Sequence, residues 1–66
     1  MIKFNEQDIK IGDLARCRYI KDENVTLLVI KIDKYVCLMA HNMEIFWLTK
    51  KHIVEQTKAG YWRWVK

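Results

Sequence analysis

Apolar and polar residues alternate with a period of two along most of the chain, a pattern that predicts β-strands. In the first such segment, residues 14–20, Arg16 and Arg18 alternate with apolar residues. Side chains of successive residues point to opposite faces of a strand. We therefore expect this strand to bury one face and to expose the face with the two arginines. The Gly12-Asp13 pair before it predicts a turn.

Residues 25–32 form the longest apolar segment, and apolar residues occupy nearly both of its faces. This pattern is typical of a central strand in a small barrel, or of a strand that bends and belongs to two sheets. Shorter apolar runs predict further strands at residues 35–40, 44–49 and 54–57, followed by a sixth strand or a tail at 61–66.

Polar clusters between these segments predict the connections. A polar loop is expected at residues 21–24, and turns are expected at 33–34, 41–43 and 58–60. In the turn at 41–43, Asn42 is the residue expected to adopt positive φ. Residues 50–53 break the alternation and predict a single helical turn of the 3-10 type. A short amphipathic helix is the prediction for residues 5–11.

Consecutive antiparallel strands of this length would leave both edges of a flat sheet open to other chains. Curling into a small barrel removes most of that exposure. The pattern therefore predicts one all-β domain over residues 1–66, a five- or six-stranded antiparallel barrel with a single 3-10 turn. Residues 1–10 would lead into the barrel, and residues 58–66 would form a C-terminal extension or the last strand.

The order of these segments is itself distinctive. The sequence Ile-Gly-Asp-Leu-Ala-Arg at residues 11–16 precedes a polar loop, a Val/Ile-rich strand, a tight turn and a Trp-bearing strand that ends in a Lys-Lys-His-Ile turn. Over residues 9–57 this organisation resembles small SH3-like barrels, most closely the KOW- and Tudor-like proteins that tailed phages often encode. The residues that carry the resemblance are Gly12, Asp13, Leu14, Arg16 and Trp47.

The resemblance implies an SH3-like barrel that binds other molecules. Its first implication is a small phage accessory protein that docks on a larger host protein complex and modulates it, through exposed aromatic rings and an open strand edge. An open edge would also permit a homo-oligomer. Its alternative implication is a KOW-like protein that binds nucleic acid. In either case we expect the protein in the cytoplasm, which is the host cytoplasm for a phage protein.

Length and composition argue against an enzyme. A chain of 66 residues forms one domain with a small core, which leaves little room for a catalytic pocket. The chain contains no Ser and no glycine-rich phosphate loop, and no pair of carboxylates is placed for acid–base catalysis. We therefore expect a non-enzymatic protein that needs no cofactor.

Membrane, secreted and metal-binding classes are also disfavoured. The apolar runs are too short for a membrane span, and the N-terminus lacks the pattern of a signal peptide. Two cysteines are too few for a secreted disulfide framework, which favours reduced thiols. Cys17, Cys37, His41 and His52 offer four zinc ligands, but their spacing lacks the paired ligands of zinc motifs. We expect no metal site.

The net charge of +4 is concentrated at the C-terminal end. Residues 1–49 contain seven basic and seven acidic side chains, whereas residues 50–66 contain five basic side chains and one acidic side chain. Three aromatic residues lie in the same C-terminal part. This asymmetry indicates an interaction surface.

Aromatic and basic side chains in the last six residues are the candidates for binding a protein partner, because Trp, Tyr and Arg are frequent anchors of interfaces. These candidates are Tyr61, Trp62, Arg63, Trp64 and Lys66. The two tryptophans share one face of the expected strand, so they could equally close the barrel as part of its core. The sequence leaves both interpretations open.

A second set of basic side chains would serve nucleic-acid binding together with residues 62–66. This set contains Arg16, Arg18, Lys50, Lys51 and Lys58. Arg16 and Arg18 would lie about 7 Å apart on one strand, close to the spacing of phosphates. Alternatively, they form a solvated face paired with Asp22, Glu23 or Glu44. Because the net charge is modest, nucleic-acid binding is the second hypothesis.

Overall fold

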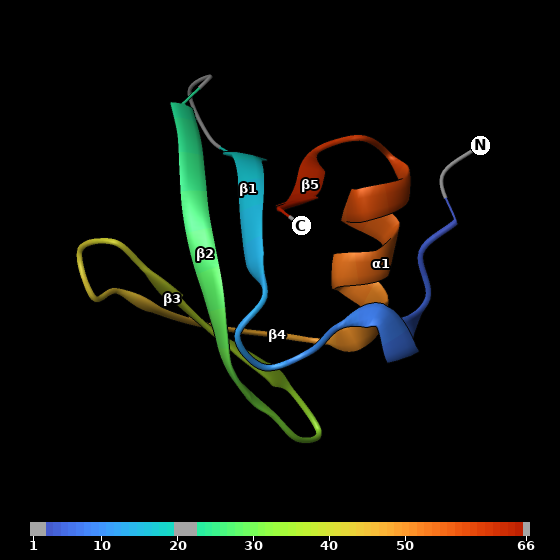
Figure 1. Cartoon of the computed structure of the whole chain (residues 1–66), viewed down its shortest axis with the longest axis horizontal. Helices are drawn as coiled ribbons and strands as arrows, with labels where there is room; N and C mark the ends of the chain where they lie inside the picture. Colours follow the sequence, from blue (N-terminus) through green and yellow to red (C-terminus); the bar gives the residue numbers. More distant parts are fainter. Residues whose placement is uncertain (1–2, 20–22, 66) are drawn as a thin grey trace.

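In the computed structural model, which describes residues 3–19 and 23–65 apart from the side chains of Tyr19 and Glu23, the chain is mostly β. Five antiparallel strands form one sheet in the order β4-β3-β2-β1-β5 (Figure 1). The strands are β1 (Leu14–Tyr19), β2 (Glu23–Ile32), β3 (Val36–Ala40), β4 (Ile45–Leu48) and β5 (Trp62–Val65), with a 3-10 helix η1 (Glu6–Asp8) and a helix α1 (Lys50–Lys58). Residues 20–22 and 66, which were assigned to the end of the first predicted strand, the polar loop after it and the C-terminal segment, lie outside the described residues.

Strand β1 confirms the predicted alternation. Ala15 and Cys17 are buried, whereas Arg16 and Arg18 are exposed. The turn before the strand is formed as expected: Gly12 has a φ of 94°, and its amide donates a hydrogen bond of 2.8 Å to the carbonyl of Val29 on β2. Asp13 is a turn residue, because its carboxylate accepts a hydrogen bond of 3.1 Å from the amide of Lys10.

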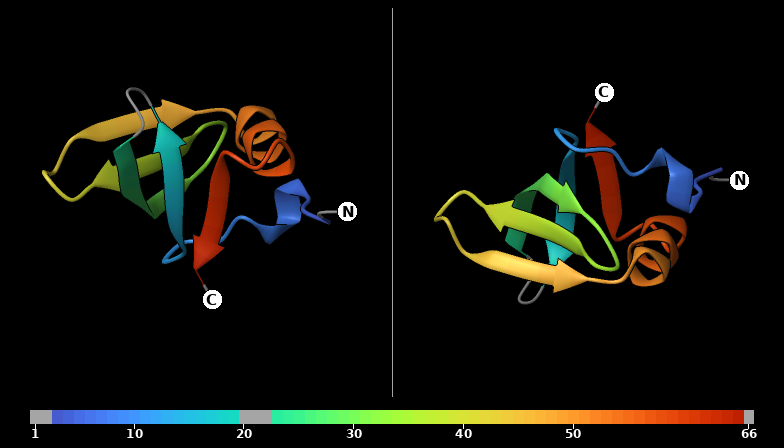
Figure 2. Two further views of the ribbon diagram at one scale, coloured as in Figure 1. Left: turned by 90° about the horizontal axis from the view of Figure 1, so that it is seen from above. Right: turned by 90° about the horizontal axis from the view of Figure 1, so that it is seen from below.

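Strand β2 belongs to both halves of the sheet. Its first part pairs with β1 and its second part with β3, and the register shifts between Val29 and Lys31. The extra residue at this bulge changes which residues point inward, so that Val29 is buried before it and Ile32 packs on the core after it. In both views of Figure 2, β3 and β4 run across the direction of β1 and β5. The sequence suggested that nearly both faces of β2 are buried. The structure shows that its outer face is partly exposed to solvent, at Thr26 and Ile30.

The hairpin between β3 and β4 corrects one turn prediction. Met43, not Asn42, adopts positive φ, at 68°. The Met43 amide donates to the carbonyl of Ala40 at 2.9 Å, and the Ala40 amide donates to the carbonyl of Glu44 at 2.8 Å. These bonds define a three-residue turn with a bulge, in which the third residue must be left-handed. Asn42 instead accepts a hydrogen bond of 3.0 Å from the amide of Glu44 through its side-chain oxygen.

Residues 50–58 form an α-helix, so the prediction of one 3-10 turn followed by a strand at 54–57 is wrong. The helix begins because the Thr49 hydroxyl accepts a hydrogen bond of 3.1 Å from the amide of His52. It ends at Lys58, and Gly60, whose φ is 88°, turns the chain away after it: the Gly60 amide donates to the carbonyl of Thr57, and the Tyr61 amide donates to that of Gln56. The β-branched residues in this segment favoured a strand locally, but the two caps define a helix.

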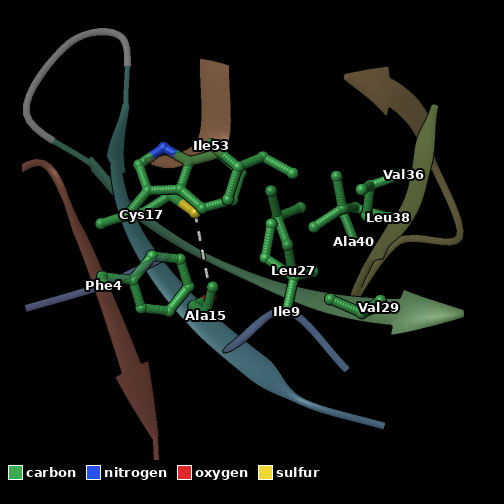
Figure 3. Packing of buried hydrophobic residues seen from close by; sticks show 11 residues of the cluster. Phe4, Ile9, Ala15, Cys17, Leu27, Val29, Val36, Leu38, Ala40 and Ile53 are labelled. Atoms are coloured by element: carbon green, nitrogen blue, oxygen red, sulfur yellow. Dashed lines mark hydrogen bonds between the residues drawn. The ribbon is translucent and has the colours of Figure 1, made fainter. Parts of the chain in front are cut away.

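The 3-10 turn lies instead near the N-terminus, at Glu6–Asp8, where the Asn5 amide donates to the Asp8 carboxylate at 2.8 Å. The segment is more than a lead-in, because Phe4 and Ile9 on either side of it are buried. Figure 3 shows these two side chains among the inward-pointing residues of β1, β2 and β3. Helix α1 adds Ile53 to the same cluster and packs beside β5 and η1.

Two further boundaries differ slightly from the predicted ones. The connection between β2 and β3 spans Asp33–Tyr35 rather than two residues, so that Tyr35 precedes β3 and is exposed. Asn24, which was expected in a loop, lies in β2.

Candidate functional site: an arginine-lined cleft

The outer face of β1 brings three arginines together. In the antiparallel register, Arg16 lies directly opposite Arg63 of β5. The amide of Arg18 donates a hydrogen bond of 2.7 Å to the carbonyl of Tyr61, which places Tyr61 beside Arg18 at the start of β5. On the other side of β1, Arg18 is opposite Asn24 of β2. Two neighbouring rows therefore cross the strands: one contains Arg16 and Arg63, and the other contains Asn24, Arg18 and Tyr61.

These side chains surround a cleft of about 320 Å³. Its walls are formed by residues of β1, β2, β5 and the α1–β5 connection, namely Arg16, Arg18, Asn24, Gly60, Tyr61 and Arg63. All three arginines and Tyr61 are exposed. None of the described residues that line the cleft is acidic. The cleft therefore offers cationic groups, an amide and an aromatic ring to a ligand.

The placement of Arg16 opposite Arg63 is unfavourable in the isolated protein. Like charges directly across two antiparallel strands repel each other and destabilise the pairing. A guanidinium group carries five donors in a planar fork that matches a phosphate or a carboxylate. An anion bound between the two arginines would remove the repulsion and satisfy these donors. The arrangement thus favours an anionic ligand more than either arginine would alone.

Trp62 belongs to the core, which decides between the two interpretations that the sequence left open and does not support its expected role in binding a partner. Its side chain is 2% exposed and lies on the inner face of β5, opposite Cys17 of β1. Its indole nitrogen has no hydrogen-bond partner among the described residues. The ring therefore presents very little of its surface to another molecule.

Trp64 is half-buried and engaged within the protein. Its ring stacks on Phe4 with a centroid distance of 5.3 Å and an interplanar angle of 10°. Its indole nitrogen donates a hydrogen bond of 3.0 Å to the Thr57 hydroxyl on α1. Of the five residues predicted to bind a partner, Tyr61 and Arg63 are exposed at the cleft, and Lys66 lies outside the described part of the chain.

The predicted nucleic-acid set is divided by the structure. Arg16 and Arg18 line the cleft, whereas Lys50, Lys51 and Lys58 lie on α1 and do not line it. The sequence reasoning missed Asn24 and Gly60 as cleft residues. The strand register that brings Asn24 beside Arg18 was not available from the pattern, whereas Gly60 lies in the turn that was predicted at residues 58–60.

The cysteines and histidines do not form a site in the described part of the chain. Cys17 and Cys37 are free and buried. Burial raises the pKa of Cys17 to about 12, so its thiol behaves as a small apolar group. Within residues 3–19 and 23–65, no group of three potential metal-ligating side chains occurs. No helix in the same residues has the length and apolar character needed to cross a membrane.

Comparisons of the chain with protein-family models, with curated proteins and with solved structures found no match. The candidate site therefore stands on its own geometry: three arginines, an exposed tyrosine and an asparagine on one face of a small antiparallel sheet.

Proposed function

We propose that this protein is a non-enzymatic binding module of the small SH3-like barrel type, and that it binds single-stranded nucleic acid in the arginine-lined cleft. The barrel assignment is supported by the bulged strand β2, which is shared by both halves of the sheet, and by the crossing of β3 and β4 over β1 and β5 (Figure 2). Helix α1 between β4 and β5 takes the place of the helical turn that the resemblance implies.

The observation that carries the ligand assignment is the gathering of Arg16, Arg18 and Arg63 around one cleft beside Tyr61. Guanidinium groups bind phosphates, and an exposed aromatic ring can stack on a base. Arg16 and Arg18, two residues apart on β1, are separated by about 7 Å, so that successive phosphates of an extended backbone could each meet a guanidinium group. A single strand fits this arrangement better than a duplex, because the ring needs an unpaired base.

Titration of a labelled single-stranded oligonucleotide, followed by fluorescence anisotropy at several salt concentrations, tests the proposal. For three phosphate contacts, log K should fall with log salt with a slope of about −2, since each contact on a single strand contributes about −0.7. Replacing Arg16 or Arg63 by Gln should lower the magnitude of this slope by about 0.7.

Lys51→Gln is the matched control, because it removes the same charge from the exposed surface of α1, outside the cleft. Its binding should stay close to that of the wild-type protein. Equal losses in Lys51→Gln and Arg63→Gln would show that binding follows net charge and would contradict the cleft assignment. An acidic peptide that binds while the oligonucleotide does not would likewise contradict it.

Docking on a larger protein, as in a phage protein that modulates a host complex, becomes the second candidate. The sequence ranked it first because the net charge is modest. Two of its expected anchors, Trp62 and Trp64, contact other parts of the protein itself. Tyr61, of which 52% is exposed, and Arg63 are the remaining anchors of that surface.

A further inference from the structure

Strand β4 has one open edge. Its inner neighbour is β3, and no described strand pairs with its other side (Figure 2). The hydrogen bond from the Ala40 amide to the Glu44 carbonyl shows that these two residues form a hydrogen-bonded pair. Hydrogen-bonded and non-hydrogen-bonded pairs alternate along an antiparallel ladder. In this register the backbone groups of Phe46 and Leu48 face β3, and those of Ile45 and Trp47 face the open edge.

The side chains of β4 do not protect this edge. Exposed edge strands commonly carry a charge, a Pro or a bulge that prevents pairing with another chain. Strand β4 has the sequence Ile-Phe-Trp-Leu. Ile45 is 43% exposed and Trp47 is 56% exposed. Among the described residues, the edge thus presents backbone donors and acceptors without a strand partner together with an apolar surface, which is what an added strand requires.

We propose that a second copy of this chain pairs with β4 in an antiparallel, two-fold arrangement centred on Trp47. In β4, only the backbone groups of Ile45 and Trp47 point to the open edge, so an added strand must place its own outward-pointing residues opposite these two. With Trp47 opposite its own counterpart, Glu44 lies opposite Lys50 of the partner subunit, and the same contact recurs by symmetry. Thr49 has extended backbone angles, and Lys50 follows it as the first residue of α1, at the end of the paired segment.

Other two-fold registers are less favourable. A centre at Ile45 would place Glu44 opposite Phe46 of the partner subunit, and a centre at Phe46 would place it opposite Leu48 of the partner subunit. Both would bring a carboxylate against an apolar side chain without an opposite charge. The register centred on Trp47 is therefore the one of these three that provides charge complementarity across the paired strands. It also brings two exposed indole rings together on the outer face of the joined sheet.

A concentration series in analytical ultracentrifugation tests this proposal with the complete chain. We expect a monomer–dimer equilibrium, and a weak one because the paired strands are short. Trp47→Lys should abolish the dimer by placing like charges at its centre. Ile11→Lys is the matched control, since it places the same charge at another exposed apolar residue, in the turn before β1 and outside β4. Far-UV circular dichroism would establish that each variant is folded.

A reciprocal charge exchange tests the register itself and does not depend on the tryptophan variant. Glu44→Lys alone and Lys50→Glu alone should each raise the dissociation constant by about ten-fold, because each creates two like-charge contacts per dimer. The double variant should restore the wild-type constant. A chain that stays monomeric at millimolar concentration, a dimer that persists in Trp47→Lys, or a double variant as weak as the single ones would each overturn the proposal.

Discussion

The indole nitrogen of Trp64 donates a hydrogen bond of 3.0 Å to the hydroxyl of Thr57, and this hydroxyl donates to the carbonyl of Ile53 at 2.8 Å. Thr57 is buried on the inner side of α1 and therefore uses its hydroxyl both as a donor and as an acceptor. The bond joins the helix to β5 and fixes the orientation of the ring that stacks on Phe4. The docking of α1 thus depends on a polar contact as well as on apolar burial.

Thr57→Val should lower the free energy of unfolding by about 1–3 kcal/mol, because it leaves the Trp64 indole nitrogen without its partner. Valine keeps the shape of the side chain, so the loss would report the hydrogen bond. Urea unfolding measures it. Thr26→Val, an equal replacement at an exposed position of β2, should change the stability little. Similar effects of the two replacements would show that the bond does not stabilise the fold.

Trp62→Ala should lower the free energy of unfolding by about 3–5 kcal/mol, as expected for a large buried side chain. Trp47→Ala, at an exposed position, should cost much less. Trp62→Phe is informative as well, because the Trp62 indole nitrogen has no partner among the described residues and its removal breaks no described hydrogen bond. Unfolding curves followed by circular dichroism provide the comparison. An undiminished stability of Trp62→Ala would contradict the core assignment.

Replacing Arg16 by Thr should have opposite effects on stability and on binding. The free protein should unfold at a higher urea concentration at low salt, because the repulsion between Arg16 and Arg63 is removed. Affinity for a single-stranded oligonucleotide should fall about ten-fold, because a charge-assisted hydrogen bond to phosphate is lost. Raised salt should reduce both effects. If stability and affinity fell together, the replacement would have disturbed the strand itself.

The thiol of Cys17 should make stability depend on alkaline pH. Burial raises its pKa from 9.0 to about 12 in the folded protein. Between these values the unfolded chain loses the proton and the folded chain keeps it. The stabilisation is therefore complete below about pH 9 and is lost as the pH rises towards 12, by at most about 1.4 kcal/mol per pH unit.

Urea unfolding at pH 8 and pH 10 measures this effect, with Cys17→Ala as the comparison that retains all other titrating groups. Between pH 8 and pH 10 the free energy of unfolding of the wild-type protein should fall by more than that of Cys17→Ala, because only the wild-type protein has this thiol. An equal fall in the two proteins would show that the thiol is not protected in the folded state.

Met43→Gly should raise the free energy of unfolding by about 1 kcal/mol. Met43 has a φ of 68°, a conformation that costs a residue with a Cβ atom about 1–2 kcal/mol. The side chain is 76% exposed, so little packing is lost. His41→Gly in the same turn should instead be destabilising, because the added freedom of the unfolded chain is not offset by relief of strain. Thermal unfolding at low protein concentration compares the two variants.

Much of the sheet was predictable from the sequence because a period of two is a local property. Alternation identified β1 and its exposed arginines, and the continuous apolar segment predicted β2 as either a central strand or one that bends and serves two sheets; the structure shows it paired with both β1 and β3. The helix α1 was missed because Ile53, Val54 and Thr57 favour strands by their side-chain shape. Thr49, which caps its start, and Gly60, which follows its end, were the available signals.

The sequence by itself determined the strands, the charge asymmetry and the presence of two tryptophans on one face of β5, because each follows from the order of neighbouring residues. Only the tertiary structure decided that this face is the inner one, where Trp62 packs in the core and Trp64 bonds to Thr57. It also decided that Arg63 meets Arg16, more than forty residues away in sequence. Strand register and helix docking depend on contacts between distant segments, which a local pattern does not contain.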